Sequence, residues 1–411
     1  MLKLGGVVIL MQLKNEYINY LVGNSIMEFK CSPLPPYSQL VCEFLNSLSI
    51  SLLSDKENNK YPDVITFAFW CRKGNIQKLK EEFNDKNMRL GRGVAFHITP
   101  SNVPINFAFS FAFSLLAGNG NIVKVPSKKF TEIDIVCRHI GDLLNDNKFK
   151  KIADMTSFIK YEHNDAITLE LSQHSAVRII WGGDSTINAI RKFPIPERSI
   201  EVAFADRYSF CVIDAQSING AGTLKIKKLA ENFYNDTYLM DQNACSSPSL
   251  LIWIGDEDNI KTAKQRFWSS VNEITVAKYK LQPVFAVDKY TELCKNAIDY
   301  EFINNFSNYG NYIYCLNLNN LPIDMENLRG KCGYFYEYDT TDINKIAYIV
   351  NTKYQTLTYF GIDKLKLTDF MLLNSLTGID RIVPIGSALD ISVIWDGYDL
   401  IRSLSRIIEV K

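Results

Sequence analysis

Cys245 lies in a polar loop within the run YLMDQNACSSPSLLIW and is the first candidate for covalent chemistry. A thiol acts as a nucleophile only when it is accessible and partly ionised. A loop between a helix and a strand exposes the sulfur and directs backbone N–H groups at it, and the same donors would stabilise an oxyanion on a bound carbonyl. The alternative is that Cys245 is a small packing residue. We assign that packing role to four cysteines in apolar stretches: Cys71, Cys137, Cys211 and Cys315.

The segment HITPSNVP places Asn102 at a predicted corner between a strand and a helix. A carboxamide there can donate a hydrogen bond to a developing oxyanion without adding a titrating group. Losing such a donor costs about 3–4 kcal/mol of transition-state stabilisation. An asparagine at this position is equally suited to cap the following helix. This segment leaves both interpretations of Asn102 open.

Two further strand ends carry groups that suit a nucleotide. In NIVKVPSKK, Lys124 ends a predicted strand and Ser127 lies in the turn after it. Ligands of open α/β sheets bind beyond the carboxyl ends of strands, so these two residues suit a ribose or a 2′-phosphate. In IIWGGDSTINAI, Gly182 and Gly183 precede a helix whose N-terminus favours a phosphate. Each turn also has an ordinary explanation, because surface lysines are usually solvated and a glycine pair usually marks a tight turn.

Together these segments predict hydride chemistry on a thioester. Attack by a loop thiolate makes an acyl-enzyme, and an amide donor holds the oxyanion. A nicotinamide dinucleotide bound at the strand ends then exchanges a hydride with the carbon held on sulfur.

The elements that must position these residues alternate along the chain. A strand GVAFHI, an apolar helix over 105–118, a strand NIVKV, a helix ending at Leu144 and a strand AVRIIW form a β-α-β-α-β pattern. This pattern predicts a Rossmann-type parallel sheet covered by helices. A change of composition after SFCVID indicates a second α/β domain that carries the thiol. The chain is expected to end in short strands and a final helix within GYDLIRSLSRII.

We therefore expect an α/β protein of three parts. Residues 1–215 form a nucleotide-binding domain with an N-terminal extension, and residues 216–377 form the catalytic domain. Residues 378–411 either return to the cofactor domain or form an oligomerisation element.

Composition excludes several classes of protein. The 411 residues carry 45 Lys and Arg against 45 Asp and Glu, so a broad positive field for nucleic acid is absent. Nine cysteines without a C-x-x-C pair exclude a disulfide framework and a zinc ribbon and indicate a reducing cytoplasm. Four scattered histidines give no metal site. The apolar run 105–118 is shorter than the ~20 residues of a membrane span. The opening MLKLGGVVILMQLK lacks a cleavage signal and is predicted to be a strand.

Five blocks of the sequence together resemble the acyl-CoA reductase family: GRGVAFHITPSNVPINFAFSFAFSLLAGNGNIVKVPS, WGGDSTINAIRKFP, YLMDQNACSSP, KYQTLTYFG and RIVPIGSALDISVIWDGYDLI. The family includes the fatty-acid reductase of bacterial bioluminescence and is a divergent branch of the aldehyde dehydrogenase superfamily. The similar blocks extend from about residue 62 to residue 406. The resemblance implies an aldehyde dehydrogenase-like fold with a cofactor domain, a catalytic domain and a small oligomerisation element.

The resemblance also implies roles for individual residues. Cys245 matches the nucleophile, and Asn102 matches the side-chain half of the oxyanion hole. Lys124 and Ser127 match contacts to the adenosine ribose, and Gln355 matches a position near the nicotinamide. Two stretches match the dinucleotide lining and the pyrophosphate turn: Ile98, Thr99 and Pro100, and Gly182, Gly183 and Ser185.

One departure from the wider superfamily is informative. Hydrolytic aldehyde dehydrogenases carry a glutamate in a Glu-Leu-Gly-Gly run, and this glutamate activates the water that releases the acid. The corresponding stretch here is VAFADRYSF, which has no such run. Because water attack would waste the acyl-enzyme of a reductase, the departure favours thioester reduction over aldehyde oxidation.

The sequence therefore predicts an aldehyde-forming oxidoreductase that takes its acyl group from CoA or from a protein thioester. NADPH is the expected cofactor, because family members use it and because Lys128 and Lys129 can receive its phosphate. The alternative is an acyltransferase that passes the Cys245-bound acyl group to another acceptor without reduction. The resemblance further implies an acyl-protein synthetase partner and a homo-oligomer.

Overall fold

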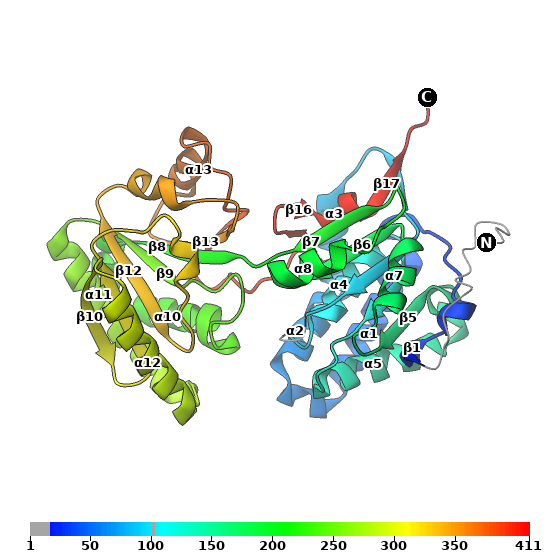
Figure 1. Ribbon diagram of the computed structural model, residues 1–411, viewed down its shortest axis with the longest axis horizontal. Coiled ribbons are helices and arrows are strands. Elements are labelled where there is room, and N and C mark those ends of the chain that lie inside the picture. Colours follow the sequence, from blue (N-terminus) through cyan, green and yellow to red (C-terminus); the bar gives the residue numbers. More distant parts are fainter. Residues whose placement is uncertain (1–16, 101–102) are drawn as a thin grey trace. The chain divides into compact units, whose positions relative to one another are not determined.

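The computed structural model describes residues 17–100 and 103–411 (Figure 1). It contains two compact units, one of which ends at Ala205 and resumes as Tyr398–Lys411, while the other is Asp206–Gly397. The boundaries we expected were 215/216 and 377/378. The difference arises because β8 (Tyr208–Asp214) and β14 (Arg381–Pro384) both pair within the sheet of the second unit. The strand expected in MLKLGGVVILMQLK lies outside the described residues.

The first unit contains a six-stranded sheet in the order β1-β5-β4-β3-β6-β7. β1 is antiparallel to its neighbour, and the other five strands are parallel. The strands are β1 (Asn19–Gly23), β3 (Val94–Ile98), β4 (Gly120–Lys124), β5 (Thr156–Lys160), β6 (Val177–Trp181) and β7 (Ile200–Phe204). The helices are α1 (Gln39–Ser54), α2 (Pro62–Trp70), α3 (Lys73–Phe83), α4 (Asn106–Leu116), α5 (Thr131–Leu144), α6 (Lys150–Asp154), α7 (Asp165–Gln173), α8 (Asp184–Arg191) and α14 (Leu400–Leu404). The predicted β-α-β-α-β pattern and its parallel sheet are confirmed.

Helix α4 confirms the prediction of a buried helix. On one side its Phe111 ring packs edge-on against Phe158 of β5, with centroids 5.0 Å apart. On the other side its Phe113 ring packs edge-on against Trp70 of α2 at 5.3 Å. Because the helix is covered by a sheet on one face and a helix on the other, it has no need of a polar face.

The final helix expected in GYDLIRSLSRII is wrong for most of its length. α14 has five residues, and the chain then forms β17 (Ser405–Ile408), which pairs antiparallel with β2 (Met88–Gly91). The buried Arg89 side chain fastens this pairing, since its Nε donates to Ser405 Oγ at 2.9 Å. A partner strand more than 300 residues away therefore overrides the local helical pattern.

The second unit contains a seven-stranded sheet in the order β10-β11-β12-β9-β8-β13-β14. β10 is antiparallel to β11, and the remaining neighbours are parallel. The remaining strands are β9 (Leu250–Ile254), β10 (Ile303–Tyr309), β11 (Ile313–Leu318), β12 (Tyr334–Thr340) and β13 (Tyr354–Phe360). The helices are α9 (Ala215–Gly220), α10 (Thr223–Thr237), α11 (Glu257–Lys278), α12 (Pro283–Asp299) and α13 (Lys364–Leu373). Two-residue strands, β15 (Ile394–Trp395) and β16 (Tyr398–Asp399), lie near the end of the chain.

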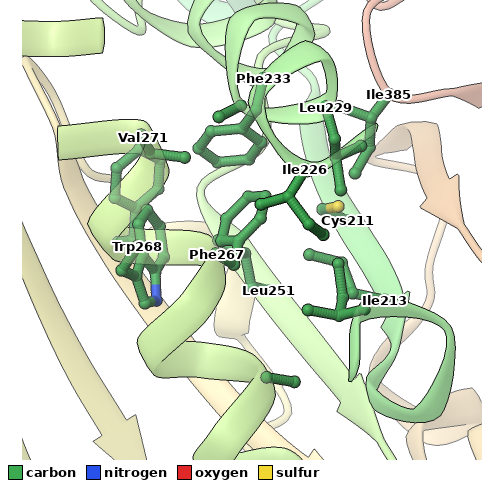
Figure 2. Close-up of a cluster of buried hydrophobic side chains, with 14 of the residues drawn as sticks. Cys211, Ile213, Ile226, Leu229, Phe233, Leu251, Phe267, Trp268, Val271 and Ile385 are labelled. Carbon is green, nitrogen blue, oxygen red and sulfur yellow. The ribbon is translucent and has the colours of Figure 1, made fainter. Parts of the chain in front are cut away.

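In this unit, the side chains of alternate residues of the central strands pack into two separate cores. Cys211 of β8 and Leu251 of β9 pack with Phe233 of α10 and Phe267 of α11 (Figure 2). Their neighbours in sequence point to the opposite face and pack beneath α13 and the loops around it. In the first of these cores, Glu337 Oε1 accepts hydrogen bonds from the indole nitrogens of two tryptophans at 2.7 and 2.9 Å: Trp253 and Trp268.

Within residues 17–100 and 103–411, no helix is long and apolar enough to cross a membrane. In the same part of the chain, no group of three His, Cys, Asp or Glu side chains is arranged to hold a metal ion.

Candidate active site

Cys245 lies in a loop at the amino edge of the second sheet. α10 ends at Thr237, a short 3-10 turn follows, and the loop enters β9 at Leu250. The loop begins with two left-handed residues, Asp241 at φ 50° and Gln242 at φ 61°. Such backbone angles are strained for residues with a side chain, so surrounding contacts must hold them. One of these contacts is the Gln242 N–H, which donates to the Thr237 carbonyl at 2.7 Å.

Charged groups surround the Cys245 thiol, which is exposed. Partial desolvation by neighbouring protein atoms is the main cause that raises the pKa of Cys245 above its ordinary value, and the nearby carboxylates of Asp206 and Asp396 also raise it. A hydrogen bond from the backbone N–H of Arg207 and the positive charge of Arg329 lower the pKa. The sulfur therefore has two groups in place that favour the thiolate, although desolvation and the two carboxylates still outweigh them.

Most of the other cysteines are less exposed than Cys245. All nine are free and lie in the described part of the chain, and Cys294 on α12 is the second exposed one. The four cysteines assigned to packing are buried, and desolvation raises the pKa of each: Cys71, Cys137, Cys211 and Cys315. Their predicted packing role is confirmed.

Hydrogen bonding joins the carboxyl ends of β3 and β4 in the first unit. The Thr99 hydroxyl donates to the Lys124 carbonyl at 2.7 Å. The Lys124 ammonium lies over the Tyr161 ring, 4.5 Å from its centroid, and desolvation lowers the pKa of this lysine. Ile98 is only 6% exposed, so little of this residue is open to a ligand. Pro100 is half-buried at the end of this stretch.

The turns after β4 and β6 are open to solvent. Ser127 is exposed in the turn after β4. Gly183 is the N-cap of α8, and a Cβ added there would meet nothing within 4 Å. A Cβ at Gly182 would lie 3.0 Å from Thr186 Cγ2, so this position favours glycine for steric reasons. Ser185 is exposed in the first turn of α8.

The structure thus brings the predicted cofactor residues to one sheet edge. β4, β3 and β6 are consecutive in the first sheet and parallel, so residues 98–100, 124–127 and 182–185 all follow strands at the carboxyl edge. Cys245 belongs to the second unit. Asn102 lies outside the described residues.

A buried hydrogen-bond network behind this edge was missed by the sequence analysis. His97 Nε2 lies 3.0 Å from Asn121 Oδ1, and His97 Nδ1 lies 2.7 Å from Ser110 Oγ, which accepts from Trp181 Nε1 at 3.0 Å. Because a carboxamide oxygen only accepts, Nε2 carries the proton and Nδ1 accepts from the serine. Burial lowers the pKa of His97 to about 4. The signal in the sequence was a histidine inside an otherwise apolar strand directly before ITP.

Gln355 was placed near the nicotinamide by resemblance. In the structure its side chain is 3% exposed, and its Nε2 donates to Asp396 Oδ1 at 2.9 Å. Asp396 in turn lies 3.1 Å from Arg207 Nη1. Gln355 therefore contributes to the ion-pair network beside the nucleophile loop.

Comparison with known proteins identifies the family. Residues 72–408 match the family model described as acyl-CoA reductase (LuxC). The chain belongs to this family. It is 22% identical over 325 residues to the long-chain acyl-protein thioester reductase of Photorhabdus luminescens, covering 77% of this chain and 63% of the relative. It is 28% identical over 168 residues to the enzyme of the same name from Aliivibrio fischeri, covering 40% of this chain and 33% of the relative.

The chain thus spans less than two thirds of the length of these curated relatives. Among solved structures, the NAD-dependent benzaldehyde dehydrogenase of Corynebacterium glutamicum is similar with a TM-score of 0.61 and 12% identity, covering 90% of this chain and 84% of that one. Aldehyde dehydrogenase 21 of Physcomitrella patens is similar with a TM-score of 0.59 and 13% identity, covering 85% and 78%. These likenesses confirm the predicted aldehyde dehydrogenase-like fold.

Proposed function

We propose that this chain reduces an acyl thioester to the aldehyde, with Cys245 as the nucleophile and NADPH as the reductant. The observation that carries the proposal is the exposed Cys245 thiol, which receives a hydrogen bond from the Arg207 N–H in the second unit of an aldehyde dehydrogenase-like fold. Membership of the acyl-CoA reductase family and the names of the curated relatives support the reaction class.

In the proposed reaction, the Cys245 thiolate forms a bond to the acyl carbon, and the bond from that carbon to the sulfur of the donor breaks. The donor leaves as a thiolate, which takes up a proton. The Cys245 N–H and the Asn102 carboxamide donate to the carbonyl oxygen while it carries negative charge. When NADPH is bound, the chemistry that it would supply is a hydride to the acyl carbon, which would leave NADP⁺. The bond between that carbon and the Cys245 sulfur then breaks, which releases the aldehyde and restores the thiolate.

Hydrolysis of the acyl-enzyme would need a base that activates water. The stretch before β8 carries one carboxylate, Asp206, and its Oδ1 is held by Arg329 Nη1 at 2.8 Å. A carboxylate oxygen that already accepts from a guanidinium is less available to hold an attacking water. This arrangement supports reduction of the acyl group in preference to release of a free acid.

The carboxyl edge of the first sheet fits a dinucleotide. Lys124 and Ser127 would contact the adenosine ribose, with Lys128 and Lys129 beside its 2′-phosphate. The stretch of Ile98, Thr99 and Pro100 would line the dinucleotide. The turn of Gly182, Gly183 and Ser185 would receive the pyrophosphate. The open N-terminus of α8 after Gly183 supports this placement, because helix N-termini favour anions.

The proposal extends to the setting of the enzyme. The acyl donor is acyl-CoA or an acylated protein, an acyl-protein synthetase is the expected partner, and the enzyme works in the cytoplasm as a homo-oligomer. The named relatives act on acyl-protein thioesters, which supports a protein donor.

Substitution of Cys245 by Ala tests the proposal. The variant should fold as the wild type does but take up no label from radioactive acyl-CoA. It should also oxidise no NADPH with acyl-CoAs from acetyl to palmitoyl, because the acyl group has no sulfur to join. Cys294→Ala is the matched control, since it removes the second exposed thiol and should leave both activities intact. Retained labelling of Cys245→Ala would remove Cys245 from the mechanism. Labelling of the wild type without NADPH oxidation would instead indicate an acyltransferase.

A further inference from the structure

We propose that Gln242 and Ser209 are positioning residues for Cys245. They connect the loop that carries Cys245 to β12 and β8, the two strands that neighbour β9 in the second sheet. The inference rests on the proposed function, in which Cys245 is the nucleophile. Neither side chain is part of the proposed acyl or cofactor contacts. Both act through the backbone of the loop that carries the sulfur.

Both polar atoms of the Gln242 carboxamide form hydrogen bonds with backbone groups. Its side chain is buried, and Oε1 accepts from the N–H groups of Gly333 at 3.1 Å and Tyr334 at 3.2 Å. Its Nε2 donates to the carbonyls of Pro248 and Tyr334, both at 3.1 Å. The carboxamide therefore joins the start of the loop to its end at Pro248 and to the first residue of β12.

This bonding explains how the loop keeps its strained start. A left-handed backbone at Asp241 and Gln242 persists only where other contacts enforce it. The Cys332 N–H donates to the Asp241 carbonyl at 3.1 Å and adds a second connection to the turn before β12. Cys245 lies between the two loop positions that the Gln242 side chain connects, so its backbone has little freedom to shift.

Ser209 holds Cys245 from the other side. This serine of β8 is 1% exposed, and its hydroxyl donates to the carbonyl of Cys245 at 2.7 Å. The same oxygen accepts from the Thr356 N–H of β13 at 3.2 Å. The Ser209 carbonyl also accepts from the Ser249 N–H at 3.1 Å, just before β9. The hydroxyl thus fixes the peptide group of the nucleophile itself.

The order of strands in the sheet places the contacts of Gln242 and Ser209 on opposite sides of the loop. β9 follows the loop, and β12 and β8 are its two neighbours in the sheet. Gln242 ties the loop to β12, and Ser209 ties it to β8, so Cys245 is held from both sides at the amino edge. A shift of about 1 Å in a reacting group costs up to about 100-fold in rate, so these bonds should matter for turnover more than for cofactor binding.

The test uses Ser209→Ala and Gln242→Met in the full chain, each with a matched control. Ser49→Ala removes an equally buried hydroxyl that donates to a carbonyl at 2.6 Å in the first unit. Gln282→Met makes the same glutamine change at an exposed position. Steady-state turnover is measured with acyl-CoA and NADPH. Iodoacetamide alkylation of Cys245 is followed against pH by mass spectrometry, with the exposed Cys294 as the internal reference.

We expect kcat to fall by about 10- to 100-fold in each variant, with KM for NADPH within about twofold of the wild type. The pH profile of Cys245 alkylation should move away from that of the wild type, because the sulfur loses its fixed place beside the Arg207 N–H. The Cys294 profile and both controls should match the wild type. A general loss of stability would not give this pattern, since it would also open buried cysteines such as Cys211 to alkylation.

Two results separate the possible failures. If Cys245→Ala is inactive while Ser209→Ala and Gln242→Met keep wild-type kcat and alkylation profiles, the positioning proposal is wrong and the proposed function stands. If Cys245→Ala keeps wild-type turnover, the proposed function itself is wrong. Should Gln242→Met fail to fold, Gln242→Asn takes its place, because it keeps a neutral carboxamide but is one methylene too short to keep all the contacts to Pro248, Gly333 and Tyr334.

Discussion

The two units use opposite edges of their parallel sheets. In the first unit the candidate cofactor residues follow β3, β4 and β6 at the carboxyl edge. In the second unit Cys245 precedes β9, and the groups that act on its sulfur precede β8 and β12 at the amino edge. The carboxyl edge of an α/β sheet provides helix N-termini for phosphates. The amino edge provides no such helix ends, so a thiol there must obtain its stabilisation in another way.

The electrostatics of the two edges follow from this difference. At the first edge, α8 begins after Gly183 and directs its positive end outward. At the second edge, α10 ends before the Cys245 loop, and a helix C-terminus disfavours a thiolate. Arg329 and the Arg207 N–H therefore supply the positive potential that a helix start would otherwise give.

The two units also differ in the direction in which burial shifts the pKa of one ionisable group in each. In the first unit, burial lowers the pKa of His97 to about 4, so the folded state favours the neutral imidazole. In the second unit, burial raises the pKa of Asp236 to about 7, although the Gly386 and Ala388 N–H groups donate to its carboxylate and lower it. Protonation of His97 should therefore weaken the first unit, and protonation of Asp236 should strengthen the second.

The largest effect on stability is expected from the Asp236 carboxyl group. Its folded pKa lies above its ordinary value, so its contribution to stability is complete below about pH 4 and is lost as the pH rises towards 7. The loss amounts to at most about 4 kcal/mol. Asp236→Asn should remove this slope between pH 5 and 7 and, because an amide cannot accept from both N–H groups, should be less stable at acidic pH. Urea unfolding monitored by circular dichroism measures the effect, and an unchanged slope would contradict it.

His97 should give the next largest effect, with the opposite sign. Its folded pKa is depressed, so its contribution is complete above about pH 6.5 and is lost as the pH falls towards 4. The loss is at most about 3 kcal/mol. Hydrogen exchange, corrected for its intrinsic pH dependence, should show β3 and α4 opening more easily at pH 5 than at pH 7. His97→Gln should lose this dependence, and equal protection of the wild type at both pH values would contradict the expectation.

Lys124→Met should affect cofactor binding by a smaller amount. Loss of a charge-assisted hydrogen bond, worth about 1.5–3 kcal/mol, predicts a rise of about 10- to 100-fold in KM for NADPH. Lys160→Met is the matched control, because Lys160 ends the neighbouring strand β5 and carries no predicted cofactor contact. Alkylation of Cys245 should be the same in both variants. Equal KM values for NADPH in the two variants would show that the ribose does not bind at the end of β4.

Arg329→Met should give the smallest effect. Without this cation the pKa of Cys245 should rise, since a positive charge near a thiol favours the thiolate. The pH dependence of iodoacetamide alkylation measures the change, with the exposed Arg406→Met as control. A lowered pKa of Cys245 would contradict this role of Arg329.

Local patterns in the sequence predicted much of the first unit. The apolar helix over 105–118 and the strands on either side of it follow from composition and length, and the structure confirms them. The predicted cofactor residues follow three such strands, so topology alone brings them to one edge. The contacts of the second unit could not be predicted in this way. Ser209 lies 36 residues from Cys245, and only the pairing of β8 with β9 brings its hydroxyl to the loop.

The same limit explains the differences in boundaries. The strand SFCVID was recognised, but nothing local shows whether it joins the sheet before it or the sheet after it. Its parallel neighbours are β9 and β13, and β13 begins 140 residues beyond the end of β8. Likewise β17 depends on β2, far earlier in the chain. Local patterns in a single sequence do not show which distant strands pair with one another.

The carboxylate of Glu337, shared by the indoles of Trp253 and Trp268, gives the second unit a built-in optical probe. Both rings are buried in one apolar cluster, so their fluorescence should be emitted at short wavelength while that cluster is closed. Exposure of the cluster to water would move the emission to longer wavelength. In a variant without the other three tryptophans, Trp70, Trp181 and Trp395, opening of this cluster can therefore be followed without attaching a dye.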